Sequence, residues 1–240
     1  MKEINVLKDI INNSMQIVFF TGAGVSTESN IPDFRSSKGI YKQANTNENP
    51  EEMVSRSYFK KNPLKFYRFY KDKLVYPDTK PNDAHIAIAK LEAMGKVKSV
   101  ITQNIDNLHQ MAGSNNVIEL HGSVYRNHCG TCGKKYELNF ILETEDIPYC
   151  SCGGIVEPDV VLFEDPLDGE LLDRAAKDIA NCDTLIVAGT SLSVYPAASL
   201  VRFFRGDNFV IINRDKTGMD SAADLVIRNY VGKVLKETIE

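Results

Sequence analysis

Apolar and polar residues alternate along the chain in blocks of two kinds. Short, mainly apolar runs are typical of strands buried on both faces of a parallel sheet, and they occur at residues 17–20, 97–102, 117–120, 184–188, 209–212 and 225–227. Between them, apolar residues recur at helical spacing over residues 4–15, 83–94, 171–181 and 196–204. Strands that alternate with helices predict an α/β fold with a parallel sheet wrapped by helices.

Two stretches interrupt this alternation. Residues 36–82 are rich in Lys, Asn, Tyr and Phe, and residues 122–165 contain four of the five cysteines and several glycines. Both are expected to leave the main sheet and form a second, smaller domain, so that the sheet belongs to residues 1–35, 83–121 and 166–240. One helix is expected to carry the aromatic residues of the first stretch, namely Phe59, Phe66, Tyr67, Phe69 and Tyr70.

The composition is that of a globular protein with a sizeable core, because 43% of the 240 residues are hydrophobic and 25% are charged. The net charge is −4 and no basic run is present, which disfavours a nucleic-acid partner. No apolar stretch approaches the roughly 20 residues that span a bilayer, so a membrane partner is not expected. Residues 1–5 lack the apolar core of a secretory signal, and a cytoplasmic location is therefore expected.

Four of the cysteines form two closely spaced pairs. In a reducing compartment such pairs are not expected to form structural disulfides. Two residues separate Cys129 from Cys132, one separates Cys150 from Cys152, and 17 residues lie between the pairs. Two such pairs brought together by a hairpin give tetrahedral thiolate ligation of zinc, and a redox-active pair is the alternative. Because a four-sulfur site has no open position, the pattern predicts one structural Zn²⁺. Cys182 stands apart and is expected to be a buried apolar residue.

Polar motifs follow the predicted strands, at the sheet edge where α/β proteins bind ligands. Gly22-Ala23-Gly24 comes directly after the first strand, and glycines there let backbone N–H groups approach a pyrophosphate. The third glycine of the dinucleotide-binding fingerprint would fall at Thr27, so a simple tight turn is the alternative. Two later strands are followed by the polar residues Thr190, Ser191 and Asn213. Their side chains are able to bind ribose and phosphate oxygens; the alternative is that they are ordinary polar loop residues.

Two further motifs follow the middle strands. Gln103-Asn104-Ile105-Asp106 offers amides and a carboxylate to a carboxamide and to ribose hydroxyls, or else Asn104 or Asp106 is the N-cap of a helix. His121 precedes Gly122 after the strand at 117–120. Its imidazole is suited to general-base catalysis because the ordinary pKa of histidine lies near neutrality; a hydrogen-bonded structural histidine is the alternative.

These motifs, in this order, resemble those of the sirtuin family. Residues 22–35 match the family's first motif, GAGxSxxSGIPDFR, with Asn30 in place of a glycine, and asparagine tolerates the left-handed backbone better than other residues with a side chain. Residues 103–106 resemble its QNID motif, and His121-Gly122 its catalytic histidine. Residues 157–165 resemble its substrate strand, with Glu157 in place of a basic residue and Glu164 in place of glycine. The resemblance covers residues 18 to about 231.

The resemblance implies a Rossmann-like NAD-binding domain, a small domain with a zinc ribbon, and a cleft that NAD and acetyl-lysine enter from opposite sides. It implies NAD-dependent deacetylation of protein lysines, with nicotinamide, free lysine and O-acetyl-ADP-ribose as products. His121 would be the general base on a ribose hydroxyl, and Asn104 would hold a water or a ribose hydroxyl. NAD contacts are implied for Ala23, Thr27, Phe34, Arg35, Gln103, Ile105, Asp106, His121, Thr190, Ser191, Asn213 and Val231, and acyl-lysine contacts for Val161 and Phe163.

The acyl group is expected to be uncharged. Sirtuins that remove succinyl groups resemble one another in a Tyr-x-x-Arg pair whose arginine binds the acyl carboxylate, and the aligned pair here is Tyr67 and Tyr70. Deacetylation is therefore expected to exceed desuccinylation, since a bidentate partner for the carboxylate is missing. A sirtuin-like mono-ADP-ribosyltransferase and a non-catalytic NAD-binding module are the alternatives. The chain is expected to be monomeric.

Overall fold

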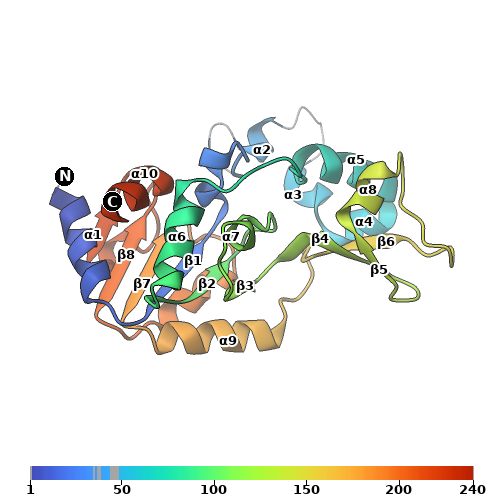
Figure 1. Ribbon diagram of the computed structural model, residues 1–240. Coiled ribbons are helices and arrows are strands. Elements are labelled where there is room, and N and C mark those ends of the chain that lie inside the picture. Colours follow the sequence, from blue (N-terminus) through green and yellow to red (C-terminus); the bar gives the residue numbers. More distant parts are fainter. Residues whose placement is uncertain (1, 35, 37–38, 44–48, 240) are drawn as a thin grey trace.

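A computed structural model of the chain describes residues 2–34, 36, 39–43 and 49–239, which form a large and a small lobe (Figure 1). The large lobe contains a six-stranded sheet of order β3-β2-β1-β7-β8-β9, and every neighbouring pair in it is parallel. This confirms the predicted parallel α/β fold. The strands are β1 Ile17–Thr21, β2 Val97–Thr102, β3 Val117–Glu119, β7 Thr184–Ala188, β8 Asn208–Ile212 and β9 Leu225–Ile227.

Helices cover both faces of this sheet, which is why its strands are mainly apolar. In β1, Ile17 and Phe19 belong to a cluster with α1 (Lys2–Asn13), α6 (Asp83–Ala93) and α10 (Val231–Ile239). Val18 and Phe20 point the other way, into a cluster with α9 (Gly169–Ala180) and the 3₁₀ helix η3 (Ala197–Phe203). Figure 1 shows α9 along the lower side of the large lobe.

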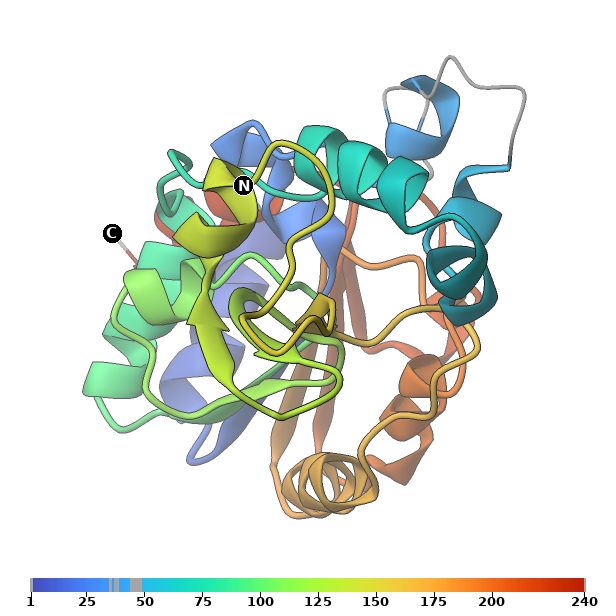
Figure 2. The ribbon, with the colours of Figure 1, turned by 90° about the vertical axis from the view of Figure 1, so that its right-hand side faces the viewer.

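The small lobe is built on a three-stranded antiparallel sheet of order β5-β4-β6. Most of its buried aromatic pairs pack edge to face, as Phe66 and Tyr67 do with ring centroids 5.3 Å apart, whereas Phe66 stacks on Tyr70. Figure 2 views this lobe end on, with the large sheet behind it. Its elements are β4 Gly122–Cys129, β5 Lys135–Glu137, β6 Val156–Val160, α2 Ile40–Gln43, α3 Pro50–Met53, α4 Arg56–Lys61, α5 Pro63–Lys73 and α8 Leu138–Glu143.

Two of the helices differ from the sequence predictions. The aromatic residues do not share one helix, because α4 ends at Lys61 and α5 begins at Pro63. Proline has no N–H to continue a helix and disfavours helical geometry in the residue before it; Asn62 accordingly has φ −134° and ψ 57°. The segment predicted as a helix at 196–204 is the 3₁₀ helix η3.

The order of the large sheet fixes where a ligand can bind. From β1 the chain moves to β2 and β3 on one side, and β7, β8 and β9 lie on the other. The carboxyl ends of β1, β2 and β7 lie side by side, since Thr21 is paired with Thr102 and with Ala188. A parallel sheet opens a crevice at such a point of reversal. The remaining short elements are η1 Ala23–Val25, η2 Thr27–Ser29, α7 Leu108–Met111 and η4 Asp220–Ala222. Among the described residues, no helix is long and apolar enough to cross a membrane.

Candidate functional site

Two adjoining cavities open at the carboxyl ends of the parallel strands. Cavity 1, of about 160 Å³, lies over the large sheet, and cavity 2, of about 230 Å³, extends towards the small lobe. Residues from four different loops line both cavities, so the cavities form one continuous site. The residues common to both are Ala23, Phe34, Gln103, Asn104, His121 and Val194.

The glycines of the first motif let two loops touch backbone to backbone. A Cβ on Gly24 would lie 2.7 Å from the carbonyl oxygen of Gly189, and a Cβ on Gly189 would lie 2.3 Å from the nitrogen of Val25. Gly189 also has φ +62°, in the left-handed region that favours glycine. Asn30 adopts the same region with φ 64°, as its substitution for the family glycine predicts.

The other residues predicted from the first motif divide into three groups. Ala23 and Phe34 line both cavities. Thr27 lines neither of them; its hydroxyl donates to the carbonyl of Gly24 at 2.9 Å and so closes the turn. Arg35 lies outside the described residues.

A short chain of hydrogen bonds orients the second motif. The amide of Asn104 donates to the Ser26 hydroxyl at 3.1 Å, and that hydroxyl donates to the Asp106 carboxylate at 2.6 Å. Asp106 also accepts from the N–H of Leu108, the first residue of α7, at 3.0 Å, and it lines cavity 2. The N-cap of α7 is Asn107 and not Asp106 or Asn104. Burial raises the pKa of Asp106, against the effect of these hydrogen bonds.

His121 has one ring nitrogen held by the backbone. Its Nδ1 lies 2.9 Å from the carbonyl oxygen of Gln103, an acceptor that requires the proton to be on Nδ1 in the neutral ring. Nε2 is then the basic nitrogen. Gly122, directly after it, has φ +74°, and a Cβ there would lie 1.9 Å from the carbonyl oxygen of Asp159. Glycine is therefore required where the chain turns from His121 into β4.

Activity that depends on His121 as a base is expected to persist below the pH at which an ordinary histidine protonates, about 6.5. Burial disfavours the imidazolium and lowers the pKa of His121, although the hydrogen bond to Gln103 acts in the opposite direction. Because the base works when neutral, activity should be lost only as the pH falls through this lowered pKa. The test is the pH profile of kcat/KM with both substrates below saturation. An acidic midpoint above 6.5 would contradict the assignment.

Cavity 1 presents hydroxyls, amides and one ion pair. The Gln103 amide donates to the Thr190 hydroxyl at 3.1 Å. Arg214 pairs with Asp33 at 3.2 Å and lies over the Tyr230 ring. Hydroxyl and amide groups beside a glycine turn suit the ribose and phosphate oxygens of a dinucleotide. The lining also includes Ser191, Asn213 and Val231, three further residues predicted from the sequence.

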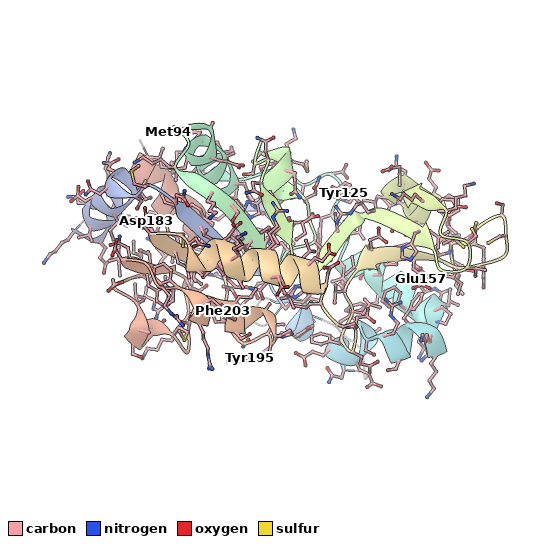
Figure 3. All side chains as sticks on the ribbon, turned by 90° about the horizontal axis from the view of Figure 1, so that it is seen from below. Met94, Tyr125, Glu157, Asp183, Tyr195 and Phe203 are labelled. Atoms are coloured by element: carbon pink, nitrogen blue, oxygen red, sulfur yellow. The ribbon has the colours of Figure 1, made fainter. Side chains whose placement is uncertain are left out.

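Cavity 2 is bounded by the segment that follows β6 and by the loop after β7. Val161 and Phe163 both line it, and the Val161 N–H donates to the His121 carbonyl at 3.0 Å. Ile105 lines the same cavity. Tyr195, which is 66% exposed, belongs to the second wall, and Figure 3 shows it on the large-lobe side of the boundary between the lobes.

The two tyrosines aligned with the acyl-binding pair of desuccinylating sirtuins do not line either described cavity. Tyr67 and Tyr70 are both fully buried in the small-lobe core, and the Tyr67 hydroxyl donates to the carbonyl of Val156 at 2.5 Å. The sequence alignment gives the position of each tyrosine along α5 but not the direction in which its side chain points. It therefore does not show that both side chains lie in the core and not in a cavity. Any acyl group bound in cavity 2 would therefore contact other residues than these two tyrosines.

The four predicted metal ligands meet at the end of the small lobe. Their sulfur atoms all lie within 4.8 Å of one another, with Cys129 3.5 Å from Cys152 and Cys132 3.6 Å from Cys150. Tetrahedral zinc with Zn–S bonds of about 2.3 Å requires sulfurs about 3.8 Å apart, whereas a disulfide requires about 2 Å. The four thiols thus fit one closed zinc site. Cys182 is buried elsewhere, as expected.

Several residues of the site were not predicted individually. Ser26 stands at a serine of the first motif, so the pattern contained its signal, yet its link between Asn104 and Asp106 appears only in the fold. Arg214, Tyr230 and Tyr195 lie in loops without periodicity, and no local pattern marks them. His85 and His109, by contrast, are buried in contact with each other behind the site.

Comparison with known proteins gives a consistent result. Residues 22–196 match the model of the Sir2 family. An NAD-dependent protein deacetylase from Clostridium perfringens is 58% identical over 241 residues, covering 99% of each chain. A solved Sir2 structure with deacetylated p53 peptide and 3'-O-acetyl ADP ribose is 39% identical with TM-score 0.90, covering 99% of this chain and 100% of that one. Another, of Sir2 with p53 peptide and NAD+, is 41% identical with TM-score 0.85, covering 98% and 96%.

Proposed function

The chain belongs to the Sir2 family, and from this membership we propose that it is an NAD-dependent protein-lysine deacetylase. Its products would be nicotinamide, the free lysine and O-acetyl-ADP-ribose. One observation carries the proposal: His121, with Nε2 as its basic nitrogen, lines both cavities, so a single base can serve ligands bound in each. Solved relatives bind an acetylated peptide and, separately, an acetylated ADP-ribose.

In this proposal the ADP-ribose part of NAD occupies cavity 1 and its nicotinamide reaches into cavity 2. The nicotinamide is the leaving group, and the ADP-ribose accepts the acetyl group. Thr190, Ser191 and Asn213 bind ribose and phosphate oxygens, with Gln103 and Val231 beside them. The nicotinamide ring packs among Ala23, Phe34 and Ile105, where Asp106 accepts from its carboxamide. Asn104 holds a ribose hydroxyl or a water through its side-chain oxygen or its second N–H, because one N–H of its amide already donates to Ser26.

The acyl-lysine enters cavity 2 between Val161 and Phe163 on one wall and the loop that contains Tyr195 on the other. His121 accepts the proton of a ribose hydroxyl at Nε2, and the Gln103 carbonyl stabilises the proton on Nδ1 while this happens. Phe34, which lines both cavities, excludes water from the reacting groups. Acetyl-lysine-containing proteins are thus the proposed substrates.

We propose the domain limits predicted from the sequence as well. Every buried member of the small-lobe hydrophobic cluster comes from residues 36–82 or 122–165, so the small domain has its own core, and residues 1–35, 83–121 and 166–240 form the NAD-binding domain. The four cysteines hold a structural zinc in that small domain. A cytoplasmic location, a monomeric state and the absence of nucleic-acid and membrane partners stay predictions.

The experiment that tests the function follows nicotinamide and O-acetyl-ADP-ribose after the protein is mixed with NAD and an acetylated peptide. Nicotinamide release that requires the acetyl group, in step with O-acetyl-ADP-ribose formation, is expected. Release that is independent of acetylation, with ADP-ribose transferred to protein, would instead identify a mono-ADP-ribosyltransferase. No release with any acyl peptide would identify a non-catalytic NAD-binding module.

Deacetylation is expected to exceed desuccinylation by about tenfold or more, the effect of roughly 1.4 kcal/mol of electrostatic discrimination. Asp106, Glu164 and Asp165 line cavity 2 with carboxylates, and the cation among its described lining residues, Lys73, is paired with Asp72 at 2.9 Å. Because Asp165 is itself paired with Arg56, a succinyl carboxylate would face the carboxylates of Asp106 and Glu164 and would find no unpaired cation among these described lining residues. The measurement is kcat/KM on two peptides that differ only in the acyl group. Equal values would refute the prediction.

A further inference from the structure

One edge of the substrate segment 161–165 is occupied by the chain itself. The Phe163 N–H donates to the Val54 carbonyl at 3.0 Å, and the Phe163 carbonyl accepts from the Arg56 N–H at 3.0 Å. This parallel bridge joins the segment to the residues that begin α4. Within the described part of the chain, the Val161 carbonyl and the Glu164 N–H have no partner. A peptide strand can therefore pair only with backbone groups of the segment that residues 54–56 leave open, such as the Val161 carbonyl and the Glu164 N–H.

Glu164 strengthens this contact with its side chain. Its carboxylate accepts from both the N–H and the hydroxyl of Ser57, each at 2.8 Å. Glu164 has φ +78°, a left-handed conformation that is unfavourable for a residue with a side chain. The related sirtuin motif has glycine here, which would avoid the strain but offer no carboxylate. Two charge-assisted hydrogen bonds at the N-terminus of α4 hold Glu164 in this conformation.

Arg56 makes a second connection on the same side. Its guanidinium binds Asp165 through Nε at 2.9 Å and Nη2 at 2.8 Å, and it binds Glu157 through Nη1 at 2.7 Å. The three side chains are only 18–26% exposed, so solvent screens these pairs weakly. Figure 3 shows Glu157 on β6, beside the pale-blue helices. Glu157 replaces the family's usual basic residue, and in this chain Arg56 provides the positive charge from α4 instead.

We propose that Arg56 and Glu164 are positioning residues that fix the segment 161–165 as a preformed edge for the acyl-lysine peptide. Phe163, Glu164 and Asp165 are consecutive in the lining of cavity 2, so the two connections to α4 set the backbone against which a peptide must pair. The inference rests on the proposed deacetylase function. It adds that peptide affinity in this chain depends on α4, which lines neither described cavity.

The test measures steady-state kinetics of the full chain with NAD and an acetylated peptide, for Arg56→Met and Glu164→Gly. Each variant is expected to raise KM for the peptide by about tenfold, as when one or two charge-assisted hydrogen bonds are lost. Because the contact is the same in ground and transition states, kcat and KM for NAD should stay within about twofold. Arg56→Lys, which keeps the charge but loses the two-pronged contact with Asp165, should fall between wild type and Arg56→Met.

Arg68→Met is the matched control, because Arg68 forms an exposed ion pair with Asp146 on the same lobe. Its KM for the peptide should equal that of the wild type. The Ser57→Ala and Glu164→Gly substitutions should be non-additive when combined, since they remove the same contact. Thermal unfolding of each variant reports on folding.

Two results would overturn the inference alone. The first is an active wild type whose peptide KM changes less than twofold in both Arg56→Met and Glu164→Gly. The second is a parallel change of kcat and both KM values together with a lower unfolding temperature, which would indicate a purely structural role. A wild type that releases no nicotinamide in response to acetyl peptide would overturn the proposed function, and this inference with it.

Discussion

Replacing His121 with alanine is expected to lower kcat for O-acetyl-ADP-ribose formation by a factor of about 10² to 10⁴, the usual contribution of a general base. Among the described residues that line the two cavities, no other histidine can replace it. His85 and His109 are buried, and burial lowers the pKa of His85 to about 4. Asp106 already accepts from Ser26 and Leu108. The measurement is product formation at saturating NAD and peptide.

A second variant separates the chemistry of His121 from its structural role. His121→Asn keeps a side-chain N–H that can donate to the Gln103 carbonyl, which Nδ1 now contacts at 2.9 Å, but it supplies no basic nitrogen. It should therefore be as inactive as the alanine variant while unfolding at the wild-type temperature. If either variant keeps more than a tenth of wild-type kcat, His121 is not the general base.

The sequence predicted the large sheet well because its central strands are buried on both faces. β1 is apolar from Ile17 to Phe20 and β7 from Leu185 to Ala188, so both strands stand out without any tertiary information. The small lobe gave weaker signals. β6 alternates buried and partly buried residues over only five positions with Pro158 in the middle, and proline and so short a run do not identify a strand. Its pairing with β4 depends on contacts that only the fold supplies.

In the candidate site too, some residues were predictable from the sequence and others were not. Residues directly after parallel strands, such as Asn104, His121 and Thr190, were predictable because the carboxyl ends of those strands meet at one edge. Contacts across the chain were not. Ser26 reaches Asp106 over 80 residues of sequence, and Arg56 reaches Asp165 over 109. Neither spacing is periodic, so these pairings follow from how the two lobes fold and not from any local pattern.

Replacing Cys132 with serine is expected to remove bound zinc and to lower the unfolding temperature by about 5 °C or more, since a structural zinc contributes its binding energy to folding. Cys132 is the informative ligand because it is exposed, whereas Cys129 and Cys150 are buried in the small-lobe hydrophobic cluster. Its replacement breaks the metal site without opening a cavity in the core. Zinc content per chain and thermal unfolding are the measurements.

Deacetylation by Cys132→Ser should fall as well, although the zinc site has no open position for substrate. Cys129 ends β4, and β4 pairs with β6, which leads directly into the segment 161–165 of cavity 2. Cys182→Ser is the matched control: Cys182 donates to the Ile179 carbonyl at 3.2 Å, a bond that serine can keep, and its zinc content and activity should match the wild type. One zinc per chain in Cys132→Ser, or an unfolding temperature equal to that of the wild type, would contradict a structural metal held by these four thiolates.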